Sequence, residues 1–169
     1  VMQELIDASN VEGVDGVWTS EHTLSGIAYI YAVLKSDNTA FPSGIPNISA
    51  LVHGKKLYDT RTSTEAYSDN PALALYDYLT NSRYGLGIAA AEIDTTAFNT
   101  CANACDVTVT DSQGNSESTY ECHGILTTAN SYSKNIESIL SSMFGTFFYS
   151  GGVFSVKAGV YQTPTITLT

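Results

Sequence analysis

Three cysteines and a histidine are the residues of this chain best suited to hold a metal ion. Cys101 and Cys105 are four positions apart, and Cys122 is followed directly by His123. Thiolate and imidazole are preferred zinc ligands, so a strand lying beside a helix could bring all four together. Structural zinc sites usually use a tighter C-x2-C spacing, however, and free cysteine is a common core residue. We therefore expect the cysteines to pack in the core and predict no metal site.

A glycine-rich run is the second candidate for chemistry. Residues 85–90 read GLGIAA, which matches the dinucleotide-binding pattern G-x-G-x-x-A. That mechanism needs the glycines between a strand and the start of a helix, so that backbone amides meet the pyrophosphate. Here the glycines follow an expected helix, and we interpret them as its termination signal. The sequence therefore predicts no cofactor.

No nucleophile or acid–base motif is present. The chain has three histidines and neither a G-x-S-x-G nor an H-E-x-x-H pattern. Residues 111–117 fail the calcium-loop pattern and are expected to form a turn. The acidic residues around the first two expected helices are interpreted as solvated or capping groups: Asp69, Asp77, Glu92 and Asp94. Whether two of these carboxylates could form a glycoside-cleaving pair depends on their separation in space, which the sequence leaves open. We predict no catalytic residue and no enzymatic activity.

Composition excludes several classes of protein. The 169 residues carry a net charge of -10, which argues against specific nucleic-acid binding because that affinity rests on clustered Lys and Arg. No apolar run approaches the length of about 20 residues that a membrane helix needs. Three cysteines are too few for a disulfide framework, so synthesis in a reducing cytoplasm is expected. Both ends of the sequence look cut, and we expect a piece of a longer polypeptide.

Tyrosine is abundant, at 11 residues. A tyrosine ring can be buried while its hydroxyl reaches water or a partner, so an excess of tyrosine fits subunit contacts. The rings could equally fill a thin core. The sequence leaves both interpretations open.

Helical periodicity and capping define the elements that would position these residues. Asn70 is a good N-cap and Pro71 suits the first helical position, so a helix is expected at about 71–82. A second helix should follow Asp94, and a third should run from about Tyr132 to Phe144. The apolar stripe of the first helix is Ala72, Leu75, Tyr76 and Leu79.

Residue patterns typical of β-strands occur before and after the helical region. Residues 17–19, 26–34 and 47–53 read as strands, and residues 58–68 as a connector without periodicity. A further strand is expected at 120–127. Residues 146–157 should form a hairpin, because Gly151 and Gly152 supply a turn with positive φ.

The expected fold class is α+β: a β-rich N-terminal part, then three helices packed on a small antiparallel sheet, ending in a β-hairpin. The expected organisation is a β-rich segment at 1–57 belonging to a neighbouring domain, a connector at 58–69, and an α+β domain at 70–169.

One motif resembles a known family. The residues are DNPA at 69–72, Tyr76-Asp77, and RYGLG at 83–87, followed by YECHG at 120–124 and GTFFYSGG at 145–152. GIPN at 44–47 and GKKLYD at 54–59 lead into this region. The pattern resembles the tail-tip, host-specificity protein J of lambda-like phages over roughly residues 28–168. Residues 1–25 match no part of the pattern.

The resemblance implies a structural role. Such proteins form a trimeric hub that closes the distal end of the tail tube and joins it to the host-recognition fibre. This chain would be an internal part of that hub, with other tail proteins as partners, located at the virion tail tip after synthesis in the bacterial host. The family offers no catalytic residue to carry over. A glycan- or receptor-binding module and a tail-associated cell-wall hydrolase are the alternatives.

Three residues are candidates for contact with a neighbouring domain or subunit. Tyr78 and Arg83 lie off the apolar stripe of the first helix, and Tyr84 begins the glycine run. We predict that Tyr78, Arg83 and Tyr84 contribute to such an interface.

Overall fold

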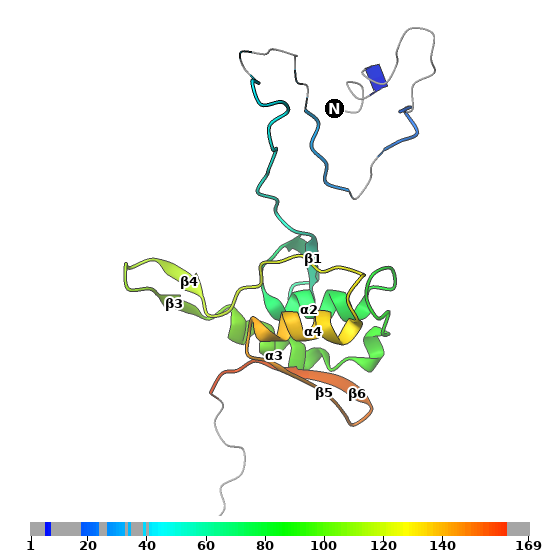
Figure 1. The fold of residues 1–169 in the computed structure, drawn as a ribbon. Helices are drawn as coiled ribbons and strands as arrows, with labels where there is room; N and C mark the ends of the chain where they lie inside the picture. Colours follow the sequence, from blue (N-terminus) through cyan, green and yellow to red (C-terminus); the bar gives the residue numbers. More distant parts are fainter. Residues whose placement is uncertain are drawn as a thin grey trace, which may run out of the picture. The chain divides into compact units, whose positions relative to one another are not determined.

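A computed structural model describes residues 6–7, 18–23, 27–32, 34, 39 and 41–161. Its contacts divide the chain into two units, 1–51 and 52–169. The helices and strands described below belong to the second unit (Figure 1). Among the described residues, no helix is long and apolar enough to span a bilayer.

Three α-helices form the centre of this unit as far as it is described, to residue 161, and each begins at a side-chain cap. They are α2 (Pro71–Thr80), α3 (Thr95–Cys105) and α4 (Tyr132–Ser141), and a short 3-10 helix, η1 (Ala90–Glu92), precedes α3. Asn70, Asp94 and Ser131 each accept hydrogen bonds from amides in the first turn of the helix that follows. α2 packs against both α3 and α4. The three expected helices are confirmed, with slightly earlier ends.

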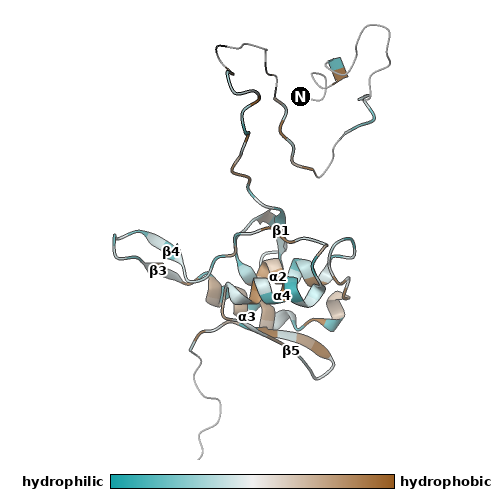
Figure 2. Cartoon of the chain, viewed as in Figure 1, coloured by the Kyte–Doolittle hydropathy of each residue, from teal (hydrophilic) through white to brown (hydrophobic). Residues whose placement is uncertain are grey.

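The described part of this unit also contains three antiparallel hairpins. They are β1 (Lys56–Asp59) with β2 (Thr64–Tyr67), β3 (Thr108–Thr110) with β4 (Ser116–Ser118), and β5 (Thr146–Ser150) with β6 (Val153–Lys157). β6 packs against α3. Brown, apolar segments lie on parts of α2, α3 and β5, whereas the visible side of α4 is mostly teal to white and β3–β4 is pale to teal (Figure 2). The mixed α+β class and the C-terminal hairpin are confirmed, but three two-stranded sheets replace the single small sheet we expected.

The core lies between α2, α3, α4 and β6. Ala72, Leu75 and Leu79 are fully buried, as the stripe of the first helix predicts. Tyr76 is half-buried, with its ring 5.7 Å from that of Phe98. The other core side chains come from all three helices, β1, β6 and the segments beside them: Leu57, Leu73, Tyr78, Ile93, Phe98, Cys101, Ala102, Cys105, Ile139, Met143, Val156 and Ala158.

Several expected strands are wrong. The described parts of 18–55 contain no strand, and Ile27, Ile48 and Leu51 are 59%, 52% and 99% exposed. The backbone N–H and C=O groups of a strand need hydrogen-bond partners on a neighbouring strand. A run of apolar and β-branched residues favours a strand but does not provide that neighbour. The predictions for residues 1–5, 8–17 and 162–169, like parts of the strand expected at 26–34, fall outside the described residues.

The expected connector at 58–68 contains most of the β1–β2 hairpin. Hydrophobic alternation could not reveal it, because all four residues of β2 are exposed. Its turn is held by Asp59, whose carbonyl accepts from the amides of Thr62 and Ser63. The domain boundaries expected from the sequence stay a prediction.

Residues 120–127 are extended but form no strand. Tyr120 and Cys122 are half-buried against the core, while Glu121 and His123 are exposed. This alternation of half-buried and exposed side chains is the pattern that a strand produces. The amide of Cys122 bonds to the carbonyl of Asp69, however, and not to a strand ladder.

Candidate functional site

An open groove of about 720 Å³ lies beside α2. Residues from the start of β1, from α2, from α4 and from the extended segment 121–126 line it. Two clusters of polar side chains border the groove. The first comprises Lys55, Asp77 and Tyr84, and the second comprises Asp69, Glu121 and His123.

The first cluster joins the chain before β1 to α2. Lys55 Nζ lies 2.5 Å from Asp77 Oδ1 and donates to the Tyr84 hydroxyl at 2.7 Å, and that hydroxyl donates to Asp77 Oδ2. Burial works against the charge of Lys55, but its hydrogen bonds to Asp77 and Tyr84 raise its pKa above the usual value. Burial and the bond to Asp77 also raise the pKa of Tyr84. At neutral pH the cluster is therefore a Lys55–Asp77 ion pair that is hydrogen-bonded to the protonated Tyr84 hydroxyl.

Tyr78 does not lie off the buried stripe, and that expectation is wrong. Its side chain is only 2% exposed, and its hydroxyl accepts a 2.9 Å hydrogen bond from Asn135 Nδ2. The reason is that α2 is covered by α4 as well as by α3, which widens its apolar face. Tyr78 therefore has little surface to offer a partner.

Arg83 and Tyr84 remain accessible. Arg83 is exposed and Tyr84 is half-buried, and both border a shallow hollow of about 300 Å³ with Tyr132. Their role in an interface stays a prediction.

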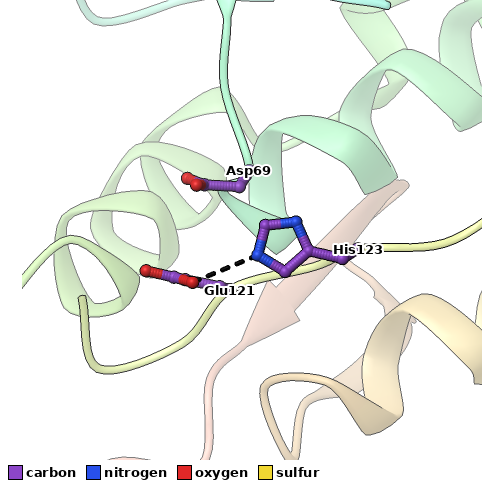
Figure 3. Close-up of side chains that lie close together, drawn as sticks. All are labelled: Asp69, Glu121 and His123. Carbon is purple, nitrogen blue, oxygen red and sulfur yellow. Dashed lines mark hydrogen bonds and ion pairs between the residues drawn. The ribbon is translucent and has the colours of Figure 1, made fainter. Parts of the chain in front are cut away.

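The second cluster brings together three potential metal ligands (Figure 3). One ligand atom from each of Asp69, Glu121 and His123 lies within 4.8 Å of the others. His123 Nε2 is 3.1 Å from Glu121 Oε2, and the His123 side chain is 61% exposed. The sequence alone did not indicate this group. The spacing Glu121-x-His123 could have suggested two ligands on one side of an extended segment, but nothing indicated that Asp69 lies beside them.

The four sulfur and imidazole ligands considered from the sequence do not come together within the described residues. Cys101 and Cys105 are buried, and their Sγ atoms lie 3.7 Å and 4.0 Å from the sulfur of Met143. Hydrogen bonding to Cys101, together with burial, raises the pKa of the Cys105 thiol. A protonated, buried thiol is a packing group, which agrees with the expected core role.

The glycine run closes α2 and does not open a phosphate site. The amides of Leu86 and Ile88 donate to the carbonyls of Tyr78 and Leu79, at 3.1 Å and 2.9 Å. Gly87 has a positive φ of 67°. Gly85 is required for a different reason, because a Cβ there would lie 1.8 Å from the Tyr78 carbonyl oxygen. These amides cap a helix and are not free to bind an anion.

Comparison with known proteins relates the chain to a phage tail protein. The chain is 28% identical over 165 residues to the tip attachment protein J of Escherichia phage SECphi27. The resemblance to tip attachment protein J is confirmed. The aligned region is 88% of this chain and 14% of the phage protein, so the chain spans about one seventh of the relative it matches. No protein-family model matches the chain.

Proposed function

We propose that this chain is a structural segment of a phage or prophage tail-tip protein. The observation that carries the proposal is the match to tip attachment protein J, which covers 88% of the chain. In that role the segment helps to close the tail tube and to link it to the host-recognition fibre. Its partners are other tail proteins and further copies of itself in a trimer, and its location is the tip of the virion tail.

Exposed apolar side chains in the second unit support a role in assembly. Ile125, Phe144 and Tyr149 are 95%, 79% and 63% exposed. Single exposed apolar residues are ordinary, but Phe144 also has a φ of 48°, which is strained for a bulky side chain. Backbone strain is a useful pointer to a functional position. We assign Phe144 to a contact with a neighbouring tail protein or subunit.

Antibody labelling of virions tests the proposed location. Antibodies raised against this segment should decorate the tail tip in negative-stain images of particles from the strain that carries the gene. Pre-immune serum is the control. Label on the capsid, on the tail shaft alone, or on no particle would contradict the proposal.

The groove favours one alternative, a module that binds a surface glycan. It is open, and Tyr84 and the Lys55–Asp77 pair border it, which offers an aromatic ring and polar groups to a sugar. A glycan array probed with the purified chain separates the two functions. Binding that is lost in Tyr84→Ala would favour the glycan module.

A further inference from the structure

We propose that Asp69, Glu121 and His123 form a surface site for a divalent transition-metal ion, with Zn²⁺ as the best fit. This inference goes beyond the tail-tip role and does not depend on it. The three side chains lie together although Asp69 comes from the β2–α2 junction and the other two come from the extended segment after β4 (Figure 3).

Backbone geometry holds the ligands in place. The Cys122 amide donates to the Asp69 carbonyl at 2.7 Å, which fixes the extended segment against the start of α2. Alternate residues of an extended chain point to the same side, so Glu121 and His123 both project next to Asp69 while Cys122 turns toward the core. The arrangement therefore does not depend on a flexible loop closing around the ion.

The distances are close to those of a loaded site. Zinc lies about 2.0–2.2 Å from nitrogen and carboxylate ligands, so two ligand atoms on one ion are up to about 4 Å apart. The three ligand atoms here lie within 4.8 Å of one another. Small rotations of the exposed Glu121 and His123 side chains toward the half-buried Asp69 bring all three to an ion, and water completes the coordination.

The donor set determines the class of metal. One imidazole and two carboxylates suit Zn²⁺, Mn²⁺ or Co²⁺, whereas Mg²⁺ and Ca²⁺ favour sites made of oxygen alone. The two carboxylates also concentrate negative charge, which a dication neutralises. Bound metal would tie the segment after β4 to the β2–α2 junction at the edge of the groove.

Calorimetric titration of ZnCl₂ into the full chain, after removal of any affinity tag, tests the site. We expect one zinc ion per chain and a melting temperature that rises with zinc concentration. His123→Gln, Glu121→Gln and Asp69→Asn should each weaken binding at least about tenfold. MgCl₂ should produce no comparable binding.

Two control variants test whether zinc binds at these three residues and not elsewhere on the chain. Cys122→Ser and His53→Gln should leave zinc affinity unchanged, because neither side chain belongs to the cluster. The absorption spectrum of the Co²⁺ complex should show no thiolate charge-transfer band. Binding lost in Cys122→Ser, binding retained in a His123→Gln variant with wild-type circular dichroism, or no binding to the folded wild-type chain would overturn the proposal.

Discussion

At the scale of single residues, Asn70 connects two helices. Its Oδ1 accepts from the amides of Ala72 and Leu73, and its Nδ2 donates to the Ala102 carbonyl and to Asp106 Oδ1. The residue is 1% exposed. As a helix cap alone it could be exchanged for aspartate, but aspartate cannot supply the two donated bonds.

Asn70→Asp should therefore destabilise the protein by about 2–3 kcal/mol, because it removes both donated hydrogen bonds and places a buried carboxylate beside Asp106. Urea unfolding measures the change. Ser131→Asp at the cap of α4 is the matched control and should change stability by less than about 0.5 kcal/mol. Equal effects in the two variants would show that Asn70 acts only as a cap.

Replacing Phe144 should have opposite effects on the stability of the chain and on particle assembly. Glycine adopts positive φ without a Cβ penalty, so Phe144→Gly should raise the midpoint of thermal unfolding of the isolated chain, by the equivalent of about 1 kcal/mol. If Phe144 contacts a neighbour, the same variant should reduce the yield of infectious particles. Ser141→Ala, exposed on α4, is the control for both measurements. Normal particle yield in Phe144→Gly would remove the assembly role.

Asp59 should make stability depend on acid pH. Hydrogen bonds from Arg61 hold the pKa of Asp59 below its ordinary value of 3.8. The unfolded chain therefore takes up the proton first as pH falls, so the stabilisation is complete above about pH 4–5 and is lost progressively as pH falls through the folded-state pKa.

Asp59→Asn should lower the free energy of unfolding by about 1 kcal/mol at pH 7, and the difference from wild type should shrink below about pH 4. Urea unfolding from pH 7 to pH 3 measures it. Glu65→Gln, exposed on β2, should change stability by less than about 0.5 kcal/mol. A difference that stays constant with pH would contradict the role of the Asp59–Arg61 pair.

At the scale of elements, the end of α2 depends on close backbone packing. Residues 85–88 fold back over its last carbonyls, and a Cβ at Gly85 would meet the backbone of both Tyr78 and Asn81. Gly85→Ala should destabilise the unit by about 2–4 kcal/mol, since a clash with backbone cannot be relieved by a rotamer change. Thermal unfolding measures the loss.

Gly54→Ala is the matched control for Gly85→Ala, because open space surrounds Gly54. It should leave the unfolding midpoint within a few degrees of wild type. A Gly85→Ala variant as stable as Gly54→Ala would mean that the chain after α2 can move aside.

Local signals explain which elements could be predicted from the sequence. The caps and apolar periodicity of α2, α3 and α4 predict these helices, and Gly151-Gly152 predicts the β5–β6 hairpin. β1–β2 stays hidden because β2 is exposed on both faces. The burial of Tyr78 and the approach of Asp69 to His123 depend on contacts distant in sequence, which one sequence does not reveal.

At the scale of the whole molecule, charge sets the behaviour toward nucleic acid. The chain carries 17 acidic and 7 basic residues. We expect it not to retard duplex DNA in a gel-shift assay at about 0.1 M salt, because few cations are available to release counterions from phosphate. A tail component with this charge would not hold DNA that passes it. Retardation by the wild-type chain would contradict the expectation.

The fastening of α2 at both ends has a consequence for how the second unit loses its structure. Asn70 attaches the first turn to α3, and the amides of Leu86 and Ile88 cover the last turn. Helices ordinarily fray from their termini, but here fraying would first have to break contacts with other elements. We therefore expect α2 to unfold in one cooperative step together with the elements it contacts. A partner that binds any of these elements would bind a rigid surface.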